Sequence, residues 1–152
     1  MNTTVFWTVL TGFITYVLGQ LAVKLVIDPV QEMKRTIGQS AHALIEHANI
    51  IGNPGVPSPE AMDAASKHLR SLSSQLQSHL YLVPGYRTTA PVFALPPKAN
   101  VLEATGLLIG LSNSLHRAPD HIYEHNAKRV DEIHDLLAIY MAPGDRYPTE
   151  SP

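Results

Sequence analysis

An uncharged apolar stretch near the N-terminus constrains this chain more than any other feature of its sequence. No side chain from Val5 to Val23 carries a formal charge, and the apolar pattern continues to Ile27. A helix over these roughly 23 residues reaches about 34 Å, enough to cross a hydrocarbon core of about 30 Å. We therefore predict a transmembrane anchor over residues 1–27 and a lipid bilayer as its partner.

Basic residues set the predicted orientation of this anchor. Lys24, Lys34 and Arg35 follow the apolar stretch, whereas residues 1–4 contain no basic side chain. Because basic flanks favour the cytoplasmic side, we expect a single-pass inner (plasma) membrane protein with its N-terminus outside and its C-terminal domain in the cytoplasm. The alternative is a cleavable signal peptide. The missing basic n-region, the long apolar run and the lack of a small-x-small site before Lys24 argue against it.

Small residues recur along one side of the predicted anchor. Thr8, Gly12, Thr15 and Gly19 are separated by four, three and four positions. Such faces let two membrane helices approach closely, and Gln20 adds a group that can hydrogen-bond between helices. We predict that these five residues form a membrane-helix association face, with a homo-oligomer as the outcome.

The rest of the chain carries helical patterns and no convincing alternating strand. Asp28-Pro29 and Ser58-Pro59 are typical helix starts, and the Asp28-Pro29 junction predicts a kink or brief interruption after the anchor. Apolar stripes predict helices over 28–52, 58–83, 100–114 and 119–140. Residues 86–98 contain three prolines and are expected to form a crossover with at most one helical turn, around 92–95.

The predicted fold class is therefore all-α: one transmembrane helix followed by a cytoplasmic four-helix bundle over 28–142, with a flexible tail at 143–152. Within the third bundle helix, Gly106, Gly110 and Ser114 are spaced by four, which predicts close approach of a neighbouring helix. About 125 residues outside the anchor suit one compact domain and not two.

Charge and cysteine content exclude several functional classes. Charged residues make up 16% of the chain and the formal net charge is −2, so the basic surplus typical of nucleic-acid binding is missing. We expect no nucleic-acid partner. The chain contains no cysteine, which excludes disulfides and Cys-based zinc or redox sites.

Eight histidines raise the question of a metal site. His121 and His125 lie four apart with Glu124 between them, and a second group comprises His42, Glu46 and His47. Structural zinc usually needs four ligands and catalytic zinc three, so neither group is complete and we expect no cofactor. A di-iron bundle would need Glu-x-x-His on two helices, and the nearest match is Asp131-x-x-His134 alone.

Catalytic signatures are missing from the sequence. There is no Gly-x-Ser-x-Gly elbow and no phosphate-cradling glycine loop. The serines at 71, 73, 74, 112 and 114 fall in predicted helices, where serine is usually a polar surface residue. We therefore do not expect an enzyme.

Several segments resemble a group of small bacterial proteins that have one N-terminal membrane helix and a helical cytoplasmic domain. The resemblance is carried by Leu18-Gly19-Gln20, Lys24, Ile27 and Pro29, together with the segments 41–45 and 108–113. It implies a bacterial inner membrane and assigns no activity.

The sequence thus supports one leading hypothesis and two alternatives. The leading hypothesis is a single-pass membrane protein whose cytoplasmic bundle self-associates or docks a protein partner. The first alternative is a membrane-perturbing effector of a bacterial defence or toxin system. The second is a metal-dependent helical-bundle enzyme.

Overall fold

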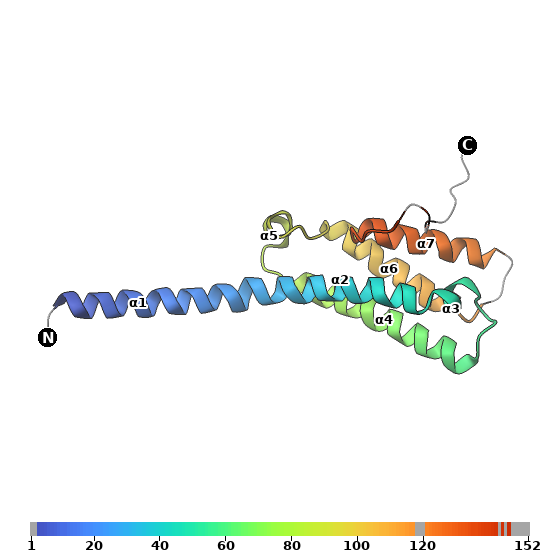
Figure 1. The fold of residues 1–152 in the computed structure, drawn as a ribbon, viewed down its shortest axis with the longest axis horizontal. Coiled ribbons are helices and arrows are strands. Elements are labelled where there is room, and N and C mark those ends of the chain that lie inside the picture. The colour runs from blue at the N-terminus through green and yellow to red at the C-terminus, as the bar shows by residue number, and fades with distance from the viewer. Residues whose placement is uncertain (1–2, 118–120, 143, 145, 147–152) are drawn as a thin grey trace.

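The fold is helical throughout the part of the chain that the structure describes. The structure is a computed structural model, and it describes residues 3–117, 121–142, 144 and 146. Figure 1 shows an elongated molecule in which one long helix projects from a packed helical domain. The helices over these residues confirm the predicted all-α class, and no strand occurs among them.

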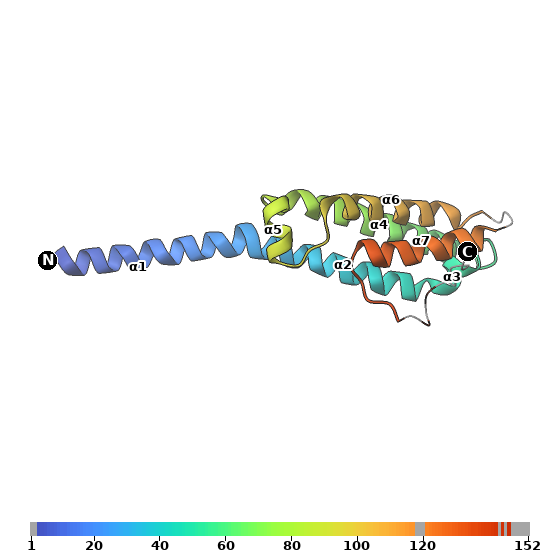
Figure 2. The same cartoon turned by 90° about the horizontal axis from the view of Figure 1, so that it is seen from above.

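The projecting helix continues without a break into the domain. It comprises α1 (Thr3–Ala22), the π-helical segment η1 (Val23–Ile27) and α2 (Asp28–Glu46), and Figures 1 and 2 show α1 running directly into α2. The chain does not leave helical geometry at Asp28-Pro29, and the kink or brief interruption expected there is limited to the π-helical segment η1 directly before Asp28. Asp28 itself is helical, and its backbone N–H donates to the Val23 carbonyl five residues back. Such a π turn lets the helix accommodate Pro29, which lacks an N–H.

Four long helices supply most of the domain. α4 (Pro59–Leu82) packs between α2 and α6 (Lys98–Ser114), and α7 (Ile122–Leu136) packs against α6. The short α3 (Ala48–Gly52) follows α2 and contacts both α4 and α7, so it closes the side between α2 and α7. The core between these helices consists mainly of aliphatic side chains: Met33, Leu69, Leu72, Leu76, Leu108, Leu111, Ile133 and Leu137.

Helix boundaries follow the local sequence with two corrections. Ser58 caps α4 as predicted, because its hydroxyl accepts the Ala61 N–H at 3.2 Å. The crossover does contain a short helix, α5 (Tyr86–Val92), but it precedes the turn expected at 92–95. α6 begins at Lys98, and α7 ends at Leu136, before the end of its predicted apolar stripe. The predicted start of the last helix at Pro119-Asp120 lies outside the described residues, and most of the tail at 143–152 does too.

Close packing of α4 on α6 depends on serines, not on the predicted glycines. Ser66 donates to the Ser112 carbonyl at 3.1 Å and Ser73 donates to the Thr105 carbonyl at 3.0 Å, both in the core. A Cβ atom added to Gly106 would meet nothing within 4 Å, and one added to Gly110 would meet the Arg129 guanidinium at 3.5 Å. The prediction that a helix approaches closely at Gly106 is therefore wrong.

Candidate functional site

The apolar surface of α1 is the largest unpartnered feature of the molecule. None of the residues in Thr3–Ala22 is buried, and the extensive contacts of the helix within the described chain are with the adjoining segment η1. By its length and composition, the continuous helix is long and apolar enough to cross a membrane. A signal sequence near an N-terminus meets the same criteria. This part of the molecule therefore presents apolar side chains that water solvates poorly.

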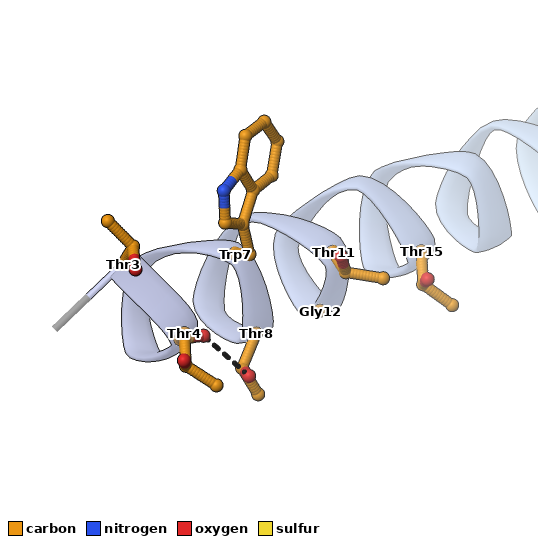
Figure 3. A pocket seen from close by; sticks show the side chains of 7 residues that line it. All are labelled: Thr3, Thr4, Trp7, Thr8, Thr11, Gly12 and Thr15. Carbon is orange, nitrogen blue, oxygen red and sulfur yellow. Dashed lines mark hydrogen bonds between the residues drawn. The ribbon is translucent and has the colours of Figure 1, made fainter.

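A shallow depression lies on the N-terminal half of α1, away from the helical domain. Figure 3 shows its residues, in which Trp7 projects as a bulky side chain and Gly12 leaves the helix backbone uncovered. Thr8 donates its hydroxyl to the Thr4 carbonyl at 2.9 Å, so this polar group is satisfied within the helix. The depression includes Thr8, Gly12 and Thr15 of the predicted association face. A Cβ atom added to Gly12 or Gly19 would meet nothing within 4 Å, so their backbones are open to a neighbour.

A histidine pair joins the end of α2 to α4. The helix breaks at His47, where the backbone leaves helical geometry with φ −96° and ψ 11°, and α3 begins at the next residue. The His47 side chain is only 13% exposed. Its Nε2 atom lies 3.0 Å from Nδ1 of His68, which projects from α4. The two rings meet edge to face, with centroids 5.2 Å apart.

Glu46 completes a compact group with these two imidazoles. Its Oε2 atom lies 3.9 Å from His47 Nε2 and 3.8 Å from His68 Nδ1. Burial lowers the pKa of His47 below its usual value, and neighbouring His68 adds to this effect, whereas Glu46 opposes it. The neutral imidazole that results is the form that binds metal ions. Among the described residues, this is the one group of histidine and carboxylate ligands close enough to share an ion.

The structure places the two predicted groups of metal ligands in different surroundings. His42 lies one turn before Glu46, with its Nε2 atom 3.9 Å from Glu46 Oε2, and is largely exposed. His121 Nδ1 lies 4.0 Å from Glu124 Oε2 on an exposed part of α7, and His125 is exposed as well. The structure thus brings Glu46 and His47 together with His68 and leaves His42 outside this group, and among the described residues it adds no third close ligand to His121 and Glu124.

Sequence reasoning missed His68 because no local spacing connects it to His47. The two residues are 21 positions apart and lie in different elements. Only the packing of α4 against α2 places their rings together. The signal available in the sequence was limited to two histidines, His68 and His79, on the predicted helix over 58–83.

A second concave surface lies at α5. Tyr86 is buried there and donates its hydroxyl to the Pro96 carbonyl at 2.8 Å, which fastens α5 to the segment before α6. Burial raises the pKa of Tyr86 to about 12. The adjacent hollow has a volume of about 440 Å³, with Arg87 and Lys98 at its wall and Ala90, Pro91 and Leu95 among its apolar lining.

Comparison of the chain with protein-family models, with curated proteins and with solved structures finds no match. The functional assignment therefore depends on the physical properties of α1, the histidine group and the α5 surface.

Proposed function

We propose that this chain is a single-pass membrane protein that self-associates through α1 and presents its helical domain in the cytoplasm as a scaffold for assembly. The observation that carries the proposal is the apolar surface of Thr3–Ala22, in which no residue is buried. Burying such a surface in water-free surroundings is strongly favourable. A bilayer would cover it along its whole length, whereas no segment of the described chain does.

The orientation follows from charge at the two ends of the anchor. Lys24 pairs with Asp28 at 2.9 Å, and Lys34 and Arg35 lie on the next turns of α2. Basic residues next to a membrane helix favour the cytoplasmic side. In this arrangement α2, α4, α6 and α7 would work as a four-helix bundle directly beneath the membrane.

Self-association is supported by the open backbone at Gly12 and Gly19. Lipid tails are as apolar as the side chains of the helix, so helices associate in membranes where small residues let backbones touch. Thr8 and Thr15 extend the same face, and Gln20 can hydrogen-bond across it. The predicted association face and the depression share Thr8, Gly12 and Thr15.

Förster transfer between labelled copies of the full chain in liposomes tests the association. We expect transfer that rises with the protein-to-lipid ratio, and Gly12→Leu or Gly19→Leu to weaken association by about 1–2 kcal/mol. Val17→Phe adds bulk on the opposite side of the helix and serves as the matched control. A chain that stays monomeric at every ratio would contradict the association.

Membrane insertion and orientation need a separate test. Because the chain lacks cysteine, a Val56→Cys variant carries one labelling site in the loop between α3 and α4. We expect carbonate-resistant membrane association, and labelling by a membrane-impermeant maleimide only after the membrane is opened. Release by carbonate would remove the anchor from the proposal, and labelling of intact cells would reverse its orientation.

A further inference from the structure

We propose that Glu46, His47 and His68 bind a divalent transition metal ion of the zinc class. Each residue offers one ligand atom, and these atoms converge from two separately packed elements, the α2–α3 junction and α4. Nitrogen and carboxylate oxygen are ligands that zinc accepts readily. Neither the anchor nor self-association requires this site, so the inference stands apart from the proposed function.

The distances among the three atoms fit a tetrahedral ion. Ligands at about 2.0–2.1 Å from zinc stand about 3.3–3.4 Å from one another in a tetrahedron. The observed separations are 3.0 Å between the two nitrogens, and 3.8 Å and 3.9 Å from these nitrogens to Glu46 Oε2. Each separation is therefore within about 0.6 Å of a tetrahedral edge, a difference that small side-chain rotations can remove.

The fourth position has two available occupants. His42 lies within 3.9 Å of Glu46 Oε2, and rotation of its exposed side chain would bring an imidazole nitrogen to the ion. Water is the other occupant, because His68 and Glu46 are 40% and 49% exposed. Binding also fixes proton positions. Without the ion, one of the two facing nitrogens of His47 and His68 donates its hydrogen to the other. A bound ion needs a lone pair on both nitrogens, so the ring that donates must carry its proton on its other nitrogen instead.

Cobalt and zinc titrations of the full chain in mild detergent test the site. We expect one ion per chain, the strong visible absorption of tetrahedral Co²⁺, and a thermal midpoint that Zn²⁺ raises, because the ion links α2 to α4. His68→Gln should lower affinity at least tenfold and abolish the thermal shift. The double variant His121→Gln/His125→Gln removes two exposed histidines and should leave both unchanged.

NMR of the imidazole nitrogens in the wild-type chain tests the site without any substitution. Zn²⁺ should shift Nε2 of His47 and Nδ1 of His68 before the signals of His121 and His125. Equal affinity in wild type and His68→Gln, or the weak absorption of octahedral Co²⁺, would overturn the proposal. First shifts at histidines other than His42, His47 and His68 would overturn it as well.

A different surface carries a second inference, which rests on the proposed membrane anchor. We infer that the corner formed by the end of α4, by α5 and by the start of α6 rests on anionic lipid headgroups. Figures 1 and 2 both place α5 beside the beginning of α2, at the end of the domain from which α1 projects. An anchored domain would hold this corner at the membrane surface.

The corner has the composition of an interfacial surface. Tyr81, Leu82 and Val92 are large apolar residues that lie exposed there. Arg87 and Lys98 are basic, and no Asp or Glu occurs between Leu80 and Leu102. Lys98 Nζ sits 5.3 Å from the centre of the Tyr81 ring, so charge and aromatic surface adjoin. Basic and aromatic side chains together are typical of membrane interfaces.

The hollow beside α5 suits part of a lipid. Its walls combine the two cations with apolar Ala90, Pro91 and Leu95, so a phosphate could meet the cations while the glycerol or upper acyl chain lies on the apolar lining. Its position beside the anchor favours lipid over a protein ligand. Each basic residue near an anionic surface contributes about a fivefold gain in binding, equivalent to about 1 kcal/mol.

An environment-sensitive probe at position 92 tests this contact in nanodiscs that hold the full chain. Val92→Cys carries the probe, and Val56→Cys is the matched control, because the two valines are 77% and 80% exposed and the loop at 56 lies at the far end of the domain. We expect blue-shifted emission and protection from iodide at position 92 alone, in discs with anionic lipid. Arg87→Gln/Lys98→Gln should weaken docking about 25-fold, whereas Lys67→Gln/Lys128→Gln should have no effect.

The outcomes separate the corner from the anchor. Brominated lipids report insertion through Trp7, the single tryptophan. Quenched Trp7 with a water-exposed probe at position 92 would overturn the lipid contact and leave the anchor intact. Unquenched Trp7 would overturn both. Protection that is equal in zwitterionic discs and grows with the number of chains per disc would assign the corner to a protein contact and overturn the lipid proposal.

Discussion

Asn126 on α7 donates its side-chain N–H to the Ile51 carbonyl on α3 at 3.1 Å, across 75 positions of sequence. The Asn126 side chain is fully buried, and its Oδ1 atom accepts the Ser114 hydroxyl at 2.7 Å. One amide thus connects α3, α6 and α7. Polar networks in a core specify a unique packing when every member is satisfied.

Asn126→Ala should therefore destabilise the domain. The variant leaves the Ile51 carbonyl without this donor, whereas Ser114 can still donate to the Leu111 carbonyl. We expect a loss of about 1–3 kcal/mol, measured by urea unfolding of the full chain in detergent. Gln77→Ala, on the exposed side of α4, should change stability by at most about 0.5 kcal/mol. Equal effects of the two variants would contradict the structural role of Asn126.

Removing the α4 cap provides a second prediction. Ser58→Ala eliminates the acceptor of the Ala61 N–H, so we expect a loss of about 1 kcal/mol in urea unfolding. Ser78→Ala lies on the exposed side of α4, near its C-terminal end, and should be neutral or slightly stabilising, because alanine is the better helix former. Similar losses in both variants would indicate that Ser58 does not act as a cap.

The buried hydroxyl of Tyr86 predicts a response to alkaline pH. Its pKa is about 12 in the folded chain against 10.0 normally, so the unfolded chain loses this proton first as pH rises. The associated stability is complete below pH 10 and is lost as pH rises through 12. Tyr86→Phe should cost about 1 kcal/mol at pH 8. Thermal melts should show this difference shrinking above pH 10, and a difference that is constant with pH would contradict the burial of the hydroxyl.

The ion pair between Asp135 and Arg146 predicts that the Asp135 carboxyl titrates at a lower pH than usual. Arg146 donates to both carboxylate oxygens, at 2.6 Å and 3.1 Å, and these hydrogen bonds hold the pKa of Asp135 below its usual 3.8. The contribution of the pair is present above that value and disappears as pH falls through the lowered pKa. In a carboxyl NMR titration, Arg146→Gln should return Asp135 toward its usual pKa, whereas exposed Arg117→Gln should not. An unchanged titration in Arg146→Gln would contradict the pair.

The sequence was sufficient for those features that depend on near neighbours. The apolar run to Ile27, the period of the stripes and the Ser58 cap each involve residues within a few turns of one another. α5 begins before the turn expected at 92–95, although Pro91 lies inside it and can donate no backbone hydrogen bond. The hydrogen bond that fastens α5, from the Tyr86 hydroxyl to the Pro96 carbonyl, spans ten positions and has no local signal in the sequence.

Features that depend on packing were beyond local patterns. His68 and Asn126 gain their importance from partners on other elements. His47, which was grouped with His42 and Glu46 from the sequence, is turned inward because the helix breaks at this residue. A break of this kind redirects one side chain without altering the apolar period on either side.

The uninterrupted helix from Thr3 to Glu46 connects α1 directly to the domain, so an angle between two α1 helices would continue into the domains. If two anchors cross at Gly12 and Gly19 at about 40°, as helices with close small-residue contacts often do, their axes diverge by about 0.7 Å for every ångström travelled. At 1.5 Å per residue, the added separation is about 14 Å at Asp28 and about 33 Å at Glu46. In such a dimer the two domains would separate progressively away from the crossing, with the α5 corners closer together than the far ends of the domains, which would be free to recruit further copies.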